Sequence, residues 1–461
     1  MSVLIKNGLV ITAERSFVED IYIEKDKISA LGVNLSFSAD RIIDAKNKYV
    51  IPGGIDVHTH LDMPLWNIFS SDDFETGTKA AAFGGTTTIV DFATQSKGMK
   101  MQEALDIWHR KADGKACIDY GFHMIITDLS GSHINGIDEM IKEGVTSFKL
   151  FMAYPGTLMI DDAKILRVMK RTADKGGLVC IHAEDGYAID TLVRQAISQG
   201  CTTPIYHALT RPPITEGNAV GRSIDLAVTA KVPVYIVHLS SNDGLQKIIA
   251  AQKKGLPIFA ETCPQYLFLS QDLLELENFE GAKYVFTPPP REKWHQEKLW
   301  EGLKNNALQV VATDHCPFNF SGQKDIGKDD FTKIPNGGPG IENRLQLLFE
   351  GGVNQKRISV NRWVEITSTA PAKIFSLYPR KGVIEVGSDA DIVIWDPKIK
   401  HTISAETHHM RVDYSMYEGL KIRGNAEIVL LRGEIIVEKG CWIGNIGRGR
   451  YIKRFPMGIN F

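Results

Sequence analysis

Six residues of metal-binding type stand in or at the ends of apolar, strand-like runs of the sequence. The first run closes with His58-Thr59-His60, and the two-residue period of a strand directs both imidazoles to one face, as two bonds to one metal ion require. Lone strand-end histidines usually only make hydrogen bonds, and the other nine histidines are interpreted as structural or surface residues. The other four residues of the set are Lys149, His182, His238 and Asp314, each on a run of its own. Because five runs carry residues of this type, we favour a shared metal site over coincidence.

Lys149 is the unusual member of this set. Between Phe148 and Leu150, it could simply be a lysine whose stem packs on apolar surface while its ammonium group reaches water. An ammonium group aimed at a metal cluster is repelled, so a functional Lys149 has to be neutral or chemically converted. Addition of carbon dioxide gives a carbamate, whose two anionic oxygen atoms can bridge hard or borderline cations.

The elements that must position these residues are apolar runs that alternate with segments of helical periodicity between residues 50 and 317. Strands followed by helices pair in parallel, and eight such strands close an α/β fold, the (β/α)8 or TIM barrel. Barrel active sites lie where the C-terminal ends of the strands meet, which is where the candidate residues stand. The eight runs cover 54–60, 86–93, 120–127, 146–152, 178–184, 232–240, 256–263 and 308–316.

Alternation of apolar and polar residues, typical of half-buried strands, occurs before residue 50 and again beyond about 378. We therefore predict a small, discontinuous β-sandwich domain built from 1–52 and 375–445, with the metal-binding barrel, 53–374, inserted between its halves. The aperiodic stretch 446–461 is interpreted as a C-terminal tail that contacts another subunit. The polar, glycine-rich loop 317–340 is a candidate lid.

Composition excludes several classes of function. The 53 Lys and Arg residues against 55 Asp and Glu give a formal charge of −2, so we expect neither nucleic acid nor an acidic membrane surface as a partner. The N-terminus lacks the apolar segment of a signal peptide and no stretch reaches about 18 apolar residues, which predicts a cytoplasmic protein. The six cysteines form no CxxC pair, as is typical of reduced thiols.

Several motifs resemble the dihydropyrimidinase and D-hydantoinase family of the amidohydrolase superfamily. They are VIPGGIDVHTHLDMP, SFKLFMAYPG, HAED at 182–185, VHLSS at 237–241, ATDHCPF and NGGPGIENR, and the resemblance extends through the whole chain. It implies two divalent metal ions, zinc by preference. His58 and His60 would hold one ion together with Asp314, and His182 and His238 would hold the other. Lys149, as N6-carboxylysine, would bridge the two ions.

The resemblance also implies residues that hold the substrate. Tyr154 would donate a hydrogen bond to the carbonyl oxygen under attack, and main-chain groups at Asn336 and Thr287 would hold the ring amide. The family has serine where this chain has Thr287, a tolerated exchange because that contact is mainly main-chain. Asp314 would move the proton of the attacking hydroxide to the leaving nitrogen. Where the family usually has a glycine-containing segment, this chain has the bulky segment 64–74. The size of the substituent on the substrate ring and the preferred substrate enantiomer therefore stay open.

The predicted activity is hydrolysis of the cyclic amide of dihydropyrimidines, as in pyrimidine catabolism, or of 5-substituted hydantoins. A metal-bridging hydroxide would attack the ring and give an N-carbamoyl amino acid. We expect a small cyclic ureide or imide substrate, an apolar pocket lining and no cationic clamp; the predicted lining residues are Met63, Leu65, Met152 and Met159. The resemblance suggests a homotetramer.

Two alternatives accompany this prediction. One is allantoinase, which uses a similar metal set; the intact tyrosine of FMAY and the NGGPGIENR segment favour the first activity. The other is a non-catalytic, tetrameric interaction protein, against which the complete set of six ligand positions argues strongly.

Overall fold

The computed structural model describes residues 2–129 and 133–456, and its centre is a parallel, eight-stranded barrel. Each strand pairs with its neighbour in sequence, and a parallel bridge between Thr59 and His315 links the first strand to the chain beyond the last. All eight predicted strands are confirmed. The strands are β8 (Gly54–Thr59), β11 (Thr86–Thr94), β12 (Asp119–Ile125), β13 (Ser147–Phe151), β14 (Leu178–His182), β15 (Val234–Ile236), β16 (Ile258–Thr262) and β17 (Val310–Val311).

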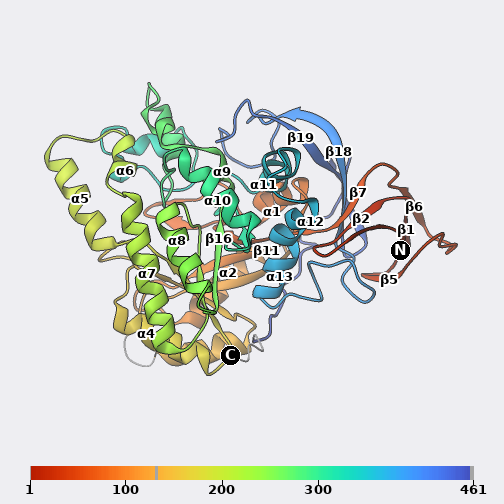
Figure 1. Cartoon of the computed structure of the whole chain (residues 1–461), viewed down its shortest axis with the longest axis horizontal. Helices are drawn as coiled ribbons and strands as arrows, with labels where there is room; N and C mark the ends of the chain where they lie inside the picture. The colour runs from red at the N-terminus through yellow and green to blue at the C-terminus, as the bar shows by residue number, and fades with distance from the viewer. Residues whose placement is uncertain (1, 130–132, 457–461) are drawn as a thin grey trace.

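Helices cover the outside of the barrel (Figure 1). The longer ones are α1 (Phe74–Phe83), α2 (Met101–Ala112), α4 (Asp162–Ala173), α5 (Gly186–Ser198), α7 (Pro213–Ala230), α8 (Asn242–Gln252) and α10 (Trp294–Lys304). The shorter ones are α3 (Gly136–Lys142), α6 (Ile205–Leu209), α9 (Pro264–Phe268), α11 (Arg344–Leu348), α12 (Val360–Val364) and α13 (Ala370–Ile374). Asp73 caps the N-terminus of helix α1, and its side chain accepts hydrogen bonds from the main chain of Glu75 and Thr76. This cap fixes the end of the loop that follows β8.

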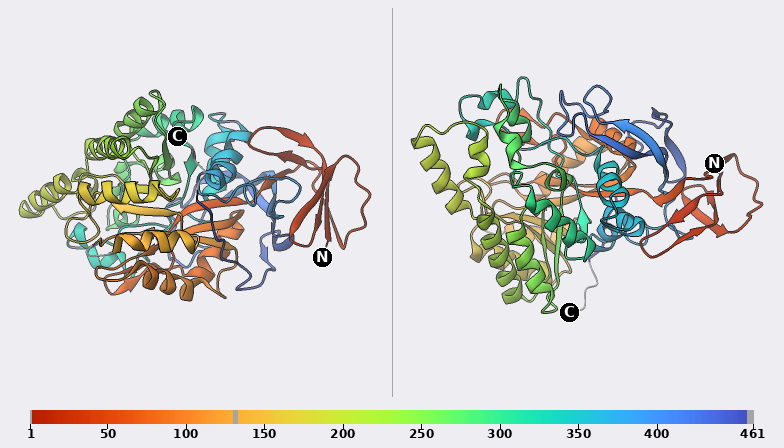
Figure 2. Two further views of the ribbon diagram at one scale, coloured as in Figure 1. Left: turned by 90° about the horizontal axis from the view of Figure 1, so that it is seen from below. Right: turned by 45° about the horizontal axis from the view of Figure 1, so that its top comes forward.

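Two further sheets form the predicted β-sandwich at the other end of the molecule (Figure 2). One contains β1 (Ser2–Lys6), β4 (Asp20–Glu24), β5 (Lys27–Gly32) and β6 (Arg41–Asp44). The other contains β2 (Leu9–Ile11), β3 (Ser16–Val18), β7 (Tyr49–Pro52), β18 (Ile392–Thr402), β19 (Lys421–Leu431), β20 (Glu434–Glu438) and β21 (Cys441–Trp442). Val3 and Ile21 of the first sheet share one core with Val50 and Ile394 of the second.

The sandwich joins both ends of the chain, because β7 pairs with β18. We propose the domain boundaries predicted from the sequence, 1–52 with 375–445 and 53–374: the chain leaves the sandwich at Pro52, and β8 of the barrel begins at Gly54. The loop after β8 contains a small hairpin of two antiparallel strands, β9 (Pro64–Leu65) and β10 (Ile68–Phe69).

The C-terminal segment packs against its own barrel as far as it is described. Arg450 and Ile452 exchange main-chain hydrogen bonds with Tyr120, at the N-terminal end of β12. The buried Arg454 donates to the hydroxyl of Ser147 at 3.0 Å. The last five residues of the predicted tail, 457–461, lie outside the described part of the chain, and the contact of the tail with another subunit stays a prediction.

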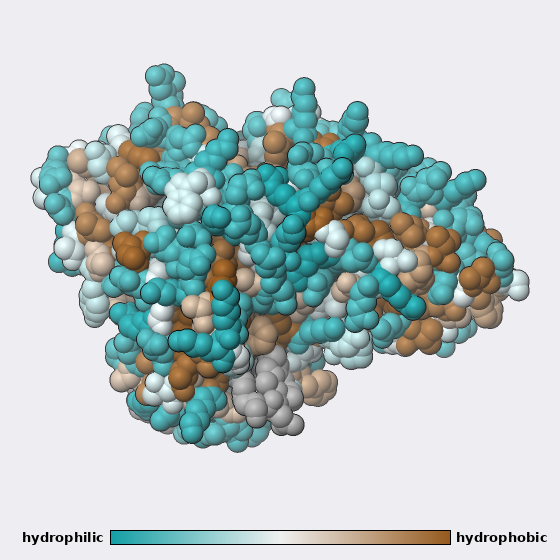
Figure 3. Space-filling model, in the orientation of Figure 1, coloured by the Kyte–Doolittle hydropathy of each residue, from teal (hydrophilic) through white to brown (hydrophobic). Residues whose placement is uncertain are grey.

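The face of the molecule in Figure 3 is largely hydrophilic, with separate apolar patches. Exposed apolar residues of the sandwich include Val18, Val33 and Ile42. Among residues 2–129 and 133–456, no helix has the length and hydropathy that crossing a bilayer requires. All six cysteines are free thiols, as predicted.

Candidate metal centre and substrate pocket

The structure brings the six predicted ligand residues together at the C-terminal end of the barrel strands. The Nε2 atoms of His58 and His60 lie 3.1 and 3.2 Å from Oδ1 of Asp314. Nδ1 of His182 lies 2.9 Å from Nε2 of His238. Ligand atoms of His58, His238 and Asp314 all lie within 4.8 Å of one another, which is close enough for one ion to bind all three.

Lys149 reaches the same place from β13. Its Nζ lies 2.9 Å from Nε2 of His58, and its side chain is buried. Burial lowers the pKa of Lys149, although the carboxylates of Asp314 and Glu261 oppose this effect. The amine of Lys149 therefore lies among the histidines rather than in water, which is not the behaviour of a surface lysine.

The electrostatics of the cluster favour an added cation. Burial lowers the pKa of His60 to about 4 and holds that of His238 well below its ordinary value, so these imidazoles are neutral at neutral pH. Burial and the charge of Lys149 act to lower the pKa of His58. The carboxylates of Asp314 and Glu261 outweigh these effects, so the net shift of this pKa is upward. Burial raises the pKa of Asp314, but His58 and His60 outweigh it and hold the pKa well below its usual range. Neutral imidazoles and an ionised carboxylate are the forms that bind divalent metal ions.

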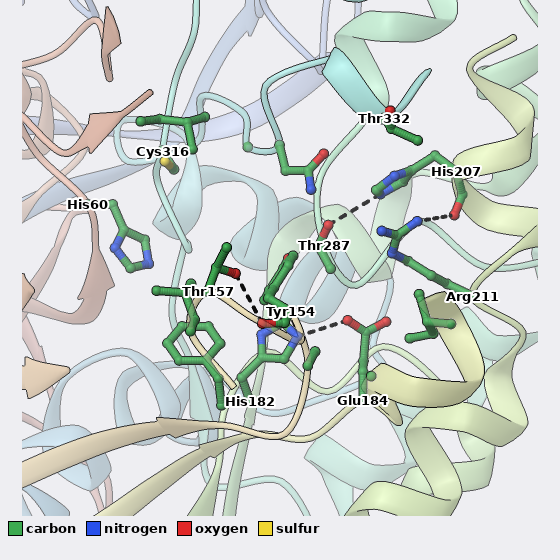
Figure 4. A pocket seen from close by; sticks show the side chains of 18 of the residues that line it. His60, Tyr154, Thr157, His182, Glu184, His207, Arg211, Thr287, Cys316 and Thr332 are labelled. Atoms are coloured by element: carbon green, nitrogen blue, oxygen red, sulfur yellow. Dashed lines mark hydrogen bonds and ion pairs between the residues drawn. The ribbon is translucent and has the colours of Figure 1, made fainter. Parts of the chain in front are cut away.

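A cavity of about 600 Å³ opens beside this cluster (Figure 4). In the view of Figure 4, Tyr154 lies between His60 on one side and Arg211 on the other. The side chains of Thr287 and Asn336 act on the phenol of Tyr154 to lower its pKa, and all three residues line the cavity, so the three predicted substrate-binding residues meet in one place. Burial, and then the charge of Glu184, raise the pKa of Tyr154 to about 12, and the phenol keeps its proton at neutral pH.

The main chain around Tyr154 has an unusual conformation. Tyr154 has a φ of +64°, which is uncommon for a residue that is not glycine. It lies in the turn that begins after β13 ends at Phe151, and its carbonyl accepts hydrogen bonds from the main chain of Thr157 and Met159. This turn directs the phenol into the cavity rather than along the strand. His207 supports Thr287 from behind, with 3.3 Å between Nε2 and Oγ1.

Two predictions about the pocket lining were wrong. Met152 and Met159 do not line the cavity, whereas Met63 and Leu65 do. Because strand residues alternate between faces, Phe151 and Ala153 line the pocket on the side of Lys149, and Met152 points away towards Ser223.

The sequence predicted no cationic clamp for the substrate, and it did not reveal that Arg211 lines the cavity. Its Nη1 donates to the carbonyl of His207 at 3.1 Å. Arg211 follows the short helix α6 in an irregular segment, where no periodicity in the sequence predicts the direction of a side chain.

Two loops form the rim of the cavity. In the segment after β8, Pro64, Leu65 and Trp66 line it, so the bulky residues that distinguish this chain do reach the pocket. The candidate lid contributes Phe331, Ile334 and Asn336. In the structure this loop is packed down: Phe331 and Ile334 are buried, and the buried Lys324 donates to the carbonyls of Val285 and Pro335. Opening of this loop stays a prediction.

Sequence reasoning missed two buried acidic residues of the site, Glu184 and Glu261. Glu184 contacts His182, and Glu261 contacts His58. A charged residue inside an apolar run is costly to bury without a partner. Glu261, within the run 256–263, could therefore have been recognised from the sequence as a carboxylate with a specific partner.

Comparison with known proteins bears directly on this geometry. A model of the amidohydrolase family matches residues 49–436. The chain belongs to the amidohydrolase family. The D-hydantoinase of Streptomyces coelicolor is 52% identical over 98% of this chain and 97% of its own length. The D-hydantoinase of Geobacillus stearothermophilus is 51% identical over 99% and 98%. The crystal structure of dihydropyrimidinase from Brevibacillus agri has a TM-score of 0.99 and 50% identity over 100% of both chains.

The chain thus lies in the hydantoinase and dihydropyrimidinase branch of the amidohydrolases, as its motifs indicated. It is an enzyme that hydrolyses cyclic amides. Membership of the family implies a divalent metal site, and the cluster of His58, His238 and Asp314 fits one.

Proposed function

We propose that the protein hydrolyses 5-substituted hydantoins, with preference for the D enantiomer, and dihydropyrimidines, and releases N-carbamoyl amino acids. The observation that carries this proposal is the convergence of six ligand-type residues beside the phenol of Tyr154, in a chain 52% identical to a D-hydantoinase. The cavity of about 600 Å³ has the size of a small-molecule site. Its rim of Leu65, Trp66 and Phe331 suits an apolar substituent on a compact ring.

We propose that the metal centre holds two zinc ions. His58 and His60, with Asp314, would bind one ion, and His182 and His238 would bind the other. Two sets of contacts support this division. His58 and His60 both contact Asp314, and His182 contacts His238. When bound, such ions lower the pKa of the attacking water and polarise the amide carbonyl.

We further propose that Lys149 is carbamylated by carbon dioxide. As a plain amine, its Nζ is buried at 2.9 Å from Nε2 of His58, in a cluster whose remaining ligands are mainly nitrogen donors. A carbamate brings in two oxygen atoms and a negative charge, and both would complement divalent ions.

The residues of the chain then divide the work of ring opening. Tyr154 donates a hydrogen bond to the carbonyl oxygen as negative charge develops there, because its raised pKa keeps the phenol protonated. Asp314 accepts a proton from the attacking water and passes it to the leaving nitrogen. The main chain at Thr287 and Asn336 orients the ring amide next to Tyr154. The apolar rim excludes water from the substituent.

Two experiments test the proposal. The first compares the turnover of D- and L-5-phenylhydantoin by the zinc-loaded enzyme; faster hydrolysis of the D enantiomer is expected, and a preference for L would contradict the stereochemical part. The second removes the metal with a chelator and restores it; loss and recovery of activity are expected. Retained activity in protein free of metal would contradict the metal-dependent reaction.

We also propose that the enzyme is a homotetramer, as the family resemblance implies. Light scattering on the purified protein should give four times the mass of the chain. The mass of a monomer or dimer would contradict this assembly.

A further inference from the structure

Two buried glutamates that are not among the six ligand residues contact the ring nitrogens that face away from the cluster. Glu261 stands on β16, a strand that contributes none of the six, and Glu184 follows His182 by two residues. Both side chains are fully buried. A buried carboxylate is stable only where donors reach it, so the donors around these two residues indicate what each carboxylate does.

Glu261 holds residues from both halves of the cluster. Its Oε1 is in hydrogen-bond contact with Nδ1 of His58 and accepts from the main-chain nitrogen of His238 at 3.2 Å. Its Oε2 accepts from the hydroxyl of Tyr235 at 2.7 Å. On the opposite side of the ring, Nε2 of His58 faces Asp314 and Lys149.

Glu184 holds His182 by the other ring nitrogen. Its Oε2 lies 2.8 Å from Nε2 of His182, a contact drawn in Figure 4. On the opposite side of this ring, Nδ1 faces Nε2 of His238 at 2.9 Å. The two glutamates therefore contact opposite nitrogens: Nδ1 in His58 and Nε2 in His182.

We propose that Glu261 and Glu184 are positioning residues that fix which ring nitrogen His58 and His182 turn towards the metal centre. A neutral imidazole carries one proton, and a carboxylate draws that proton to the nitrogen it contacts, which leaves the lone pair on the other nitrogen. The assignment is Nε2 for His58 and Nδ1 for His182. Carboxylates behind metal-bound histidines act in this way in other metalloproteins.

The two glutamates differ in reach. Glu184 contacts one histidine, whereas Glu261 contacts the ring of His58 and the main chain of His238, which belong to different halves of the cluster. We therefore expect loss of Glu261 to weaken binding of both ions, and loss of Glu184 to weaken mainly the ion held by His182 and His238.

The test measures zinc binding directly, by titrating metal-free protein with Zn²⁺ against a chromophoric chelator. Glu261→Met and Glu184→Met remove the acceptor at similar side-chain length, and each should lose about 10- to 100-fold in zinc affinity. Glu261→Gln and Glu184→Gln keep a carbonyl oxygen and should fall between the Met variants and the wild type. The matched control is Glu216→Met, because the buried Glu216 accepts from the main chain and hydroxyl of Ser240 and contacts no candidate ligand side chain.

A second readout reports on the ligand field itself. The visible spectrum of the Co²⁺-loaded protein should change in the variants of Glu261 and Glu184, and should stay as in the wild type in Glu216→Met. Circular dichroism checks that each variant folds. If a Met variant does not fold, its Gln variant decides, and Gln variants with wild-type zinc affinity and spectrum would overturn the assignment.

The inference rests on the proposed metal function, and the two fail differently. A wild-type protein that binds no Zn²⁺ would refute the metal centre itself. A wild type that binds zinc while Glu261→Met and Glu184→Met match Glu216→Met in affinity would refute only the positioning by the two glutamates.

Discussion

Replacement of Tyr154 by phenylalanine isolates one hydroxyl group of the site. The aromatic ring stays, and with it the packing against Phe151 and His182, whose ring centroids lie 6.0 and 5.5 Å away. What is lost is the donor that we place at the carbonyl oxygen under attack. Thr287 and Asn336 also act on the phenol to lower its pKa, and the variant loses this interaction as well.

The expected loss falls on kcat. Removing one preorganised donor from an oxyanion site costs about 2.7–4 kcal/mol, or about 10²- to 10³-fold in kcat. KM should change little, because the hydrogen bond strengthens only as charge develops on the oxygen. Since the pKa of Tyr154 is raised to about 12, its hydroxyl does not titrate at neutral pH, and the variant should keep the shape of the pH–rate profile.

The assay is steady-state hydrolysis of one 5-substituted hydantoin by zinc-loaded enzyme with verified metal content. The matched control is Tyr120→Phe, which removes a buried phenol bonded to Asp113 at the opposite, N-terminal end of β12 and should leave kcat unchanged. A Tyr154→Phe variant whose KM rises while kcat stays at the wild-type value would refute the reasoning, because the phenol would then bind the substrate and its transition state equally.

Three further predictions concern Lys149, Asp314 and a structural carboxylate. Lys149→Ala should lose most of the bound metal and its activity, with partial recovery when a small carboxylic acid is added; full metal occupancy and near-normal turnover would exclude the carbamate. Asp314→Asn keeps the shape of the side chain but removes the base, so kcat should fall at least about 100-fold; two bound metals together with the wild-type rate would show that another residue moves the proton. Burial raises the pKa of Asp91 to about 6, against the hydrogen bonds from Leu61, Thr59 and Trp108. The folded protein then keeps a proton that the unfolded chain releases at about pH 4, so the free energy of unfolding should fall by about 3 kcal/mol as pH rises from about 4 to 6. Asp91→Asn should remove this component in urea unfolding at a series of pH values, and an unchanged pH dependence would contradict the raised pKa.

The barrel was predictable because each strand is a short apolar run between helical segments. This pattern can be recognised locally in the sequence, without knowledge of the rest of the fold. The ends of the strands were not predictable. The run at 308–316 predicted a long last strand, but the regular strand covers only Val310–Val311, because the chain then turns to carry Asp314 into the cluster with a φ of +52°. Strand periodicity cannot indicate where functional geometry overrides pairing.

The site was predictable only where residues stand on strands. His58 and Lys149 lie in regular strands, so their period fixes the face they occupy. The same period could have excluded Met152 from the pocket, because it alternates with Lys149 and Phe151. Arg211 could not have been predicted in this way. It lies outside any strand, and the path of its segment depends on contacts with distant parts of the chain, such as the bond from Arg291 to its carbonyl.

The most direct test of the proposed function is a comparison of kcat/KM for dihydrouracil, a 5-substituted hydantoin and allantoin with the same zinc-loaded preparation. The phenol of Tyr154, the main chain at Thr287 and Asn336, and the apolar rim favour a compact ring with an apolar substituent. We predict that dihydrouracil or the hydantoin is hydrolysed at least about tenfold more efficiently than allantoin, a difference of about 1.4 kcal/mol in transition-state binding. A clear preference for allantoin would contradict the proposed function and leave the metal centre intact.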